Sequence, residues 1–102
     1  MKVDRNDAAI ALTKMRYKGE EVLITLYAPQ SLLPNYKQYS CKFSIIGGEL
    51  NYSGKSIGFD SMQSLILSLS KIGTYFEKSD DLDRSLMEWE GGPMEFPEFK
   101  NI

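Results

Sequence analysis

Only one segment of the 102-residue sequence has the periodicity of an amphipathic helix, and this limits the fold more than any other feature. Asp60 is a favourable N-cap, and Gln63 three residues later completes a capping-box pattern. Apolar residues then recur at spacings of three and four, whereas Ser64 and Ser68 fall outside this stripe. We therefore expect a helix that lies on a sheet, with Gly73 allowing close approach to a strand. The stripe consists of Met62, Leu65, Ile66, Leu69, Ile72 and Phe76.

Strand patterns occupy most of the remaining chain. Residues 39–45 alternate between apolar and polar side chains, which is typical of a half-buried strand. Residues 9–17 and 21–27 predict a hairpin with a turn at 18–20, and a change of apolar phase in the first strand predicts a β-bulge near Thr13. Further strands are predicted over residues 50–57 and 86–90, a loop over 31–37, and a packed aromatic segment over 94–99.

These elements predict an α+β fold in the order β-β-β-β-α-β, with a mainly antiparallel sheet of about five strands and one helix packed on it. The length suits one hydrophobic core, and no linker-like composition divides the chain. We expect a single domain over residues 1–102.

The composition gives little support to catalysis. Histidine is absent, which removes the commonest general base and the histidine-containing catalytic triads. Cys41 is the only cysteine, and its alternation with Phe43 predicts a buried thiol rather than a nucleophile. The segment Gly54-Lys55-Ser56 resembles the end of a phosphate-binding loop, but Glu49 stands where that motif needs glycine. We predict no enzyme, and neither catalytic residues, metal ligands nor a cofactor.

Sequence features also bear on location. The first residues are charged and lack the apolar stretch of a signal peptide. The most apolar run, residues 22–28, is too short to cross a bilayer. A single cysteine is unusual for a small secreted domain. We expect a cytoplasmic protein without a membrane partner.

Charge is distributed unevenly along the chain. Residues 1–76 contain nine basic and six acidic side chains, a balance of +3, whereas residues 77–102 contain three basic and eight acidic ones, a balance of −5. An acidic surface disfavours nucleic acid and suits a basic protein partner, although it also suits a merely solvated face. The candidate partner-binding residues are Asp80, Asp81, Asp83, Glu88, Glu90, Glu95 and Glu98.

Two acidic groups in this region could suggest other chemistry. Glu88 and Glu90 share one face of the predicted last strand, at about the spacing of a glycosidase carboxylate pair. The segment 80–83 has some likeness to a cation-binding loop, but the ligand order and glycine of an EF-hand are missing. We interpret both groups as solvent-facing.

The second half of the chain resembles a family of small bacterial proteins known only as a domain of unknown function. The resemblance runs from about residue 39 to residue 99 and rests on residues 41–47, 58–65, 89–92 and 96–97, of which Gly58-Phe59-Asp60-Ser61-Met62-Gln63 is the most specific. The chain departs from the family at Ser64, where alanine is usual. The resemblance implies one compact domain in a bacterial cytosol and carries no assigned activity.

Three hypotheses of function follow. The first is a non-catalytic protein-binding domain, in particular an immunity protein that binds and neutralises a cognate bacterial toxin such as a basic nuclease. The second is a small ligand-binding or enzymatic domain that uses carboxylates and tyrosines. The third is a homodimeric accessory subunit with Tyr36 and Tyr39 in its contact patch.

Overall fold

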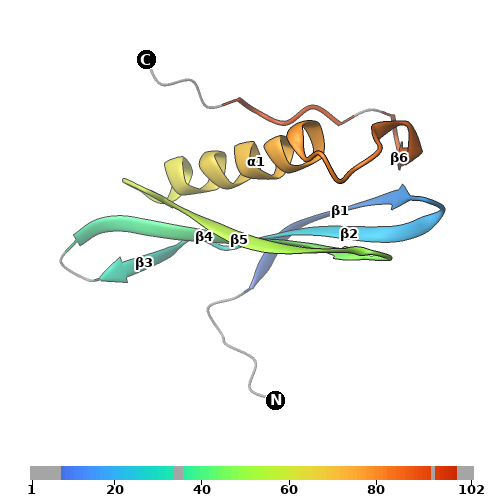
Figure 1. Cartoon of the computed structure of the whole chain (residues 1–102). Helices are drawn as coiled ribbons and strands as arrows, with labels where there is room; N and C mark the ends of the chain where they lie inside the picture. The colour runs from blue at the N-terminus through green and yellow to red at the C-terminus, as the bar shows by residue number, and fades with distance from the viewer. Residues whose placement is uncertain (1–7, 34–35, 93, 99–102) are drawn as a thin grey trace.

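A computed structural model describes residues 8–33, 36–92 and 94–98, and it has the predicted α+β architecture, an antiparallel sheet with one helix on one face (Figure 1). The sheet has six strands instead of about five. In chain order the elements are β1 (Ala9–Tyr17), β2 (Glu20–Tyr27), β3 (Gln30–Leu33), β4 (Tyr36–Gly47), β5 (Leu50–Gly58), α1 (Ser61–Lys78), a 3₁₀ helix (Arg84–Leu86) and β6 (Met87–Trp89).

The twelve-residue β4 organises the sheet. It pairs with β5 on one side and with both β2 and β3 on the other, and β1 and β6 follow beyond β2. The loop predicted over residues 31–37 is therefore wrong in part, because Gln30–Leu33 continues along β4 after the interruption at Pro29. Pro34 and Asn35 lie outside the described residues.

The hairpin of β1 and β2 is confirmed, but the bulge is displaced. Lys18 and Gly19 have φ values of 53° and 79°, as a two-residue type I′ turn requires. The register shifts between Ala9 and Ala11, and the pairing then runs without interruption to Tyr17. The predicted bulge near Thr13 is wrong. The change of apolar phase arises because β1 carries apolar side chains on both of its faces, and not because a residue is inserted. Leu12 is 56% exposed on the face away from α1.

The helix begins as predicted. Asp60 Oδ1 accepts the Gln63 amide at 2.8 Å, and Gln63 Oε1 accepts the Phe59 amide at 2.5 Å. Ile72 and Phe76 of the predicted stripe are buried, whereas Met62 is 70% exposed.

Two serines of α1 pack directly against the sheet, which corrects their predicted place outside the contact face. Ser64 and Ser68 are both fully buried. Ser68 Oγ donates to the Cys41 carbonyl at 2.6 Å, and a Cβ on Gly58 would collide with the backbone of Ser64. Small side chains let α1 approach β4 and β5 more closely than its leucines would allow.

The C-terminal segment completes the core. Phe96 packs on the rings of Phe76 and Trp89, at centroid distances of 6.4 and 6.0 Å, so the predicted packing of this segment is confirmed for Phe96, while Phe99 lies outside the described residues. The close approach predicted for Gly73 is made to Phe96, not to a strand. The fifth predicted strand shortens to β6, where Met87 and Trp89 are half-buried as expected. The buried core consists of Met15, Tyr17, Val22, Ile24, Leu26, Cys41, Phe43, Ile45, Leu50, Ile72, Phe76 and Leu82.

The opposite sheet face is uncovered in the described part of the chain (Figure 1). It exposes Leu12, Ile46 and Ile57 at 56%, 45% and 49%. No helix in the described residues is both long and apolar enough to cross a membrane.

The N-cap gives a direct test of this description. We expect Asp60→Ala to lower the free energy of unfolding by about 1 kcal/mol, because an amide of the first helical turn loses its acceptor. Asp60→Asn keeps an acceptor and should stay near the wild type. Denaturant midpoints measure both, and equal midpoints for the two variants would contradict the observed cap.

Candidate protein-binding surface

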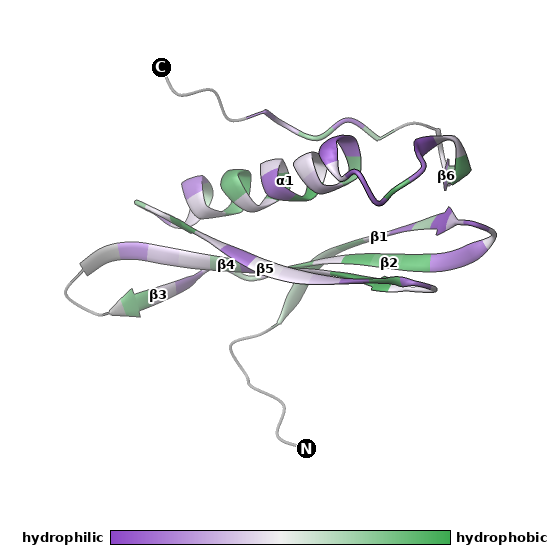
Figure 2. Cartoon of the chain, in the orientation of Figure 1, coloured by the Kyte–Doolittle hydropathy of each residue, from purple (hydrophilic) through white to green (hydrophobic). Residues whose placement is uncertain are grey.

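Three segments that are distant in the sequence meet at one end of the molecule: the β1–β2 turn, the β4–β5 turn and the loop after α1 (Figures 1 and 2). Two hydrogen bonds hold the loop to β1. The Asp83 amide donates to the Tyr17 hydroxyl at 3.0 Å, and the Lys18 amide donates to the Leu86 carbonyl at 3.2 Å. Because Tyr17 is a buried core residue, it fixes the loop to the core of the domain.

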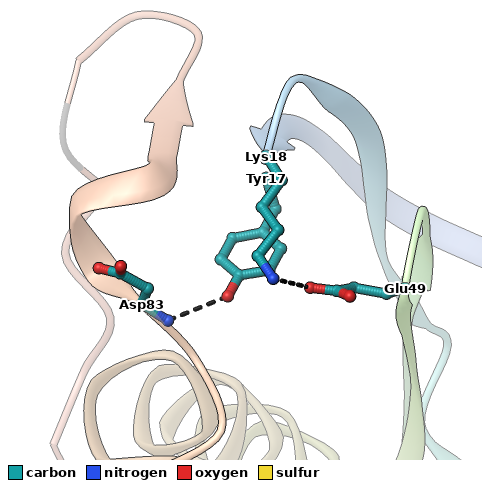
Figure 3. Close-up of polar contacts among 4 residues, drawn as sticks. All are labelled: Tyr17, Lys18, Glu49 and Asp83. Atoms are coloured by element: carbon teal, nitrogen blue, oxygen red, sulfur yellow. Dashed lines mark hydrogen bonds and ion pairs between the residues drawn. The ribbon is translucent and has the colours of Figure 1, made fainter.

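Lys18 links two of these segments (Figure 3). Its ammonium group lies 2.6 Å from Glu49 Oε1 and 5.5 Å from the centre of the Tyr17 ring. The hydrogen bond to Glu49 raises the pKa of Lys18 above its ordinary value. Lys18 therefore stays charged at neutral pH, and its ion pair with Glu49 ties the β1–β2 turn to the β4–β5 turn.

Asp83 caps the 3₁₀ helix. Its Oδ1 accepts the Ser85 hydroxyl at 2.6 Å and the Ser85 amide at 3.0 Å. These bonds and the charge of Lys18 lower the pKa of Asp83 below its ordinary value. Since a depressed pKa favours the carboxylate, Asp83 stays negative at neutral pH and in mild acid.

The three segments joined by Tyr17, Lys18, Glu49 and Asp83 all carry exposed carboxylates. We call the surface that they form the acidic end. Basic side chains in or next to the same segments include Arg16, Lys18 and Arg84. Glu20 reaches the β4–β5 turn, because its side chain lies against Gly48. We define the members of the acidic end as the carboxylates of these segments together with those of β6 and the turn that follows it: Glu20, Glu49, Asp80, Asp81, Asp83, Glu88 and Glu90.

The structure divides the seven sequence-predicted residues. Asp80, Asp81 and Asp83 lie in the loop after α1, Glu88 lies in β6 opposite Arg16 of β1, and Glu90 lies in the turn after β6. Glu95 and Glu98 lie on the C-terminal segment, which runs back along α1 away from the acidic end (Figure 1).

Sequence reasoning missed two members of the acidic end. Glu20 and Glu49 belong to residues 1–76, which are basic on average, so a count along the sequence does not select them. The signal that could have found them is their position in two turns that a meander places at the same end.

The carboxylate pair predicted on one strand does not form. β6 ends at Trp89, so Glu90 lies in the following turn, whereas Glu88 stands opposite Arg16 in the register with β1. Among the described residues, no three histidine, cysteine, aspartate or glutamate side chains are grouped to hold a metal ion. The arrangement is suited to long-range attraction of positive charge.

Cys41 lies in the interior, as its alternation predicts. Its side chain is fully buried, its thiol donates to the Tyr27 carbonyl at 3.3 Å, and burial raises the pKa of the thiol. Such a thiol is poorly placed and poorly ionised for nucleophilic attack. Tyr39 is half-buried, and the Tyr36 side chain lies outside the described residues.

Comparison with known families agrees with the resemblance of the second half and extends it. The family described as a domain of unknown function, DUF6968, matches residues 10–98. The chain belongs to this family. The match includes β1 and β2, so the family spans the whole sheet and not only the part from residue 39 onward. No curated protein and no solved structure matches the chain.

Proposed function

We propose that this member of the family is a non-catalytic protein-binding domain that captures a basic partner with its acidic end. The observation that carries the proposal is the meeting of three segments that bear exposed carboxylates, through the Lys18–Glu49 ion pair, the contact of the Glu20 side chain with Gly48 and the hydrogen bond from the Asp83 amide to Tyr17. Lys18 and the Tyr17–Asp83 hydrogen bond fix these segments relative to one another, so the charges are held in place before a partner arrives. Fixed charges steer an oppositely charged partner and lower the entropic cost of binding it.

The finer form of the proposal is an immunity protein that binds and neutralises a bacterial toxin, acting in the cytoplasm. A toxin that cleaves nucleic acid has a basic active-site surface, and a rigid group of carboxylates imitates the charge of its substrate. The absence of histidine from the sequence and the buried thiol of Cys41 support a role without catalysis.

A matched pair of variants tests the role of the acidic end. Glu88→Lys/Glu90→Lys reverses two charges at the acidic end, and Glu95→Lys/Glu98→Lys makes the same change on the C-terminal segment. The partner is captured from cells that produce this chain, purified, and mixed with each variant in stopped-flow measurements at two salt concentrations.

We expect the first variant to slow association roughly tenfold at low salt, with a much smaller effect of the second. The difference should shrink as salt rises, because salt screens exposed charges. If the two variants slowed association equally, the net charge of the protein alone would explain the effect. That result would overturn the acidic end as the binding surface. For the finer form, the captured partner should arrest growth when it is expressed alone, and co-expression of this chain should restore it.

A further inference from the structure

The long strand β5 has a free edge. Among the described strands it pairs with β4 alone. Lys71 Nζ of α1 donates to the Lys55 carbonyl at 2.9 Å, which shows that this carbonyl points away from β4. The backbone groups of a strand residue share one direction and alternate along the strand, so Ser53 and Ile57 also present theirs outward. Lys71 occupies the Lys55 carbonyl, so the edge offers a further strand the outward amides of Ser53, Lys55 and Ile57 and the outward carbonyls of Ser53 and Ile57.

A groove of about 680 Å³ runs between this edge and α1. At one end Tyr52 and Tyr75 stack with centroids 4.6 Å apart and ring planes 5° from parallel, which gives an apolar wall. Burial raises the pKa of Tyr75, in keeping with its partly desolvated position. The lining residues are Tyr52, Lys55, Ser56, Ile57, Leu67, Ser70, Lys71, Thr74 and Tyr75.

The basic residues that line the groove indicate which kind of peptide segment could bind there. Lys55 and Lys71 are the charged residues of the lining, and both are basic. Lys71 belongs to α1, whereas Lys55 alternates with buried Ser56 and so faces the other side of the sheet. A strand added at this edge would therefore meet a basic side chain on each of its faces, which favours an acidic segment.

We propose that β5 and this groove bind an extended, carboxylate-bearing segment of a partner protein by strand addition. Its backbone continues the sheet beyond β5, its apolar side chains enter the groove against Tyr52 and Tyr75, and its carboxylates lie beside Lys55. Self-pairing of β5 along its full length, about a two-fold axis at the middle of the strand, would bring Lys55 of each copy close to its equivalent, which disfavours a second copy as the occupant. This site is separate from the acidic end and does not depend on the function proposed there.

The first test is a titration of the isotope-labelled protein with two capped peptides of about eight residues, a usual strand length. One alternates valine with aspartate and the other alternates valine with lysine. We expect the acidic peptide to bind at least about tenfold more tightly and to shift the backbone amide signals of Ser53, Lys55 and Ile57. Equal binding of the two peptides, or shifts confined to other strands, would overturn the proposal.

Two variants separate strand addition from simple attraction. Ser53→Pro removes an outward amide without removing a hydrogen bond to β4, so the fold should persist while peptide binding falls at least about tenfold. Lys71→Glu should produce a similar loss. Lys78→Glu makes the same charge change on α1 outside the groove and should leave binding unchanged.

The same variants separate strand addition from self-association and from binding at the acidic end. Full binding by folded Ser53→Pro would exclude strand addition. Sedimentation of the free chain as a dimer that Ser53→Pro dissociates would also overturn the proposal and assign the edge to self-association. Glu88→Lys/Glu90→Lys should bind the acidic peptide like the wild type, so the failure of one proposed site is distinguishable from the failure of the other.

Discussion

Replacing Phe76 with alanine is expected to lower the free energy of unfolding by about 3–5 kcal/mol. Phe76 is buried where α1 meets β6 and the C-terminal segment, and its ring contacts Tyr75, Trp89 and Phe96 at centroid distances of 5.2, 5.2 and 6.4 Å. Truncation removes the ring at the centre of this group and leaves a cavity that three separate segments cannot easily fill. Denaturant unfolding, followed by circular dichroism, measures the loss.

The neighbouring Glu77→Ala variant provides the control. Glu77 is exposed on the same helical turn, so its replacement should change stability by no more than about 0.5 kcal/mol. Trp89 fluorescence should shift to longer wavelength in Phe76→Ala alone, because the indole loses its apolar neighbour. A loss of less than about 1 kcal/mol would mean that the C-terminal segment does not pack against the helix as observed.

The features predicted correctly from the sequence are those fixed by local interactions. The N-cap of α1 depends on Asp60 and Gln63, which are three residues apart, and the alternation of β4 depends on neighbouring positions. The turn predicted between the first two strands likewise depends only on neighbouring residues, and it forms at Lys18 and Gly19. Such signals are readable because the interacting groups lie within one turn or one strand.

The features predicted wrongly depend on contacts between distant segments. Ser64 and Ser68 are polar, so periodicity places them outside the stripe, but Gly58 and the Cys41 carbonyl make room and supply a partner. β3 forms because β4 is long enough to pair with it after β2 ends. Neither the closeness of two elements nor the length of a partner strand is encoded in a local pattern.

The same distinction applies to the candidate sites. Five residues of the acidic end follow one another closely and are visible as an acidic stretch, whereas Glu20 and Glu49 join them only through the meander. The groove beside β5 was not predicted at all. It depends on the strand order, which leaves β5 at an edge while α1 returns over it.

Replacing Gly47 with alanine is expected to cost about 3 kcal/mol or more. The residue has φ of 152°, and a Cβ there would collide with the Glu21 carbonyl and lie 2.6 Å from Val22 Cα. Both obstacles are backbone atoms of the paired strand β2, so no side-chain rotation relieves the collision. Either β4 must move away from β2 or the β4–β5 turn must change conformation, and overpacking of this kind typically costs about 1–3 kcal/mol in addition to backbone strain.

The Gly19→Ala variant separates the cost of a steric collision from the cost of placing alanine at a positive φ. Gly19 also has a positive φ, 79°, but no atom lies within 4 Å of where its Cβ would be. That variant should therefore lose only the cost of a left-handed alanine, about 1–2 kcal/mol. Because the β4–β5 turn carries Glu49, Gly47→Ala should also weaken the ion pair with Lys18 and slow capture of a basic partner, whereas Gly19→Ala keeps the pair. Equal losses of stability in the two variants would show that conformation alone accounts for the glycine at position 47.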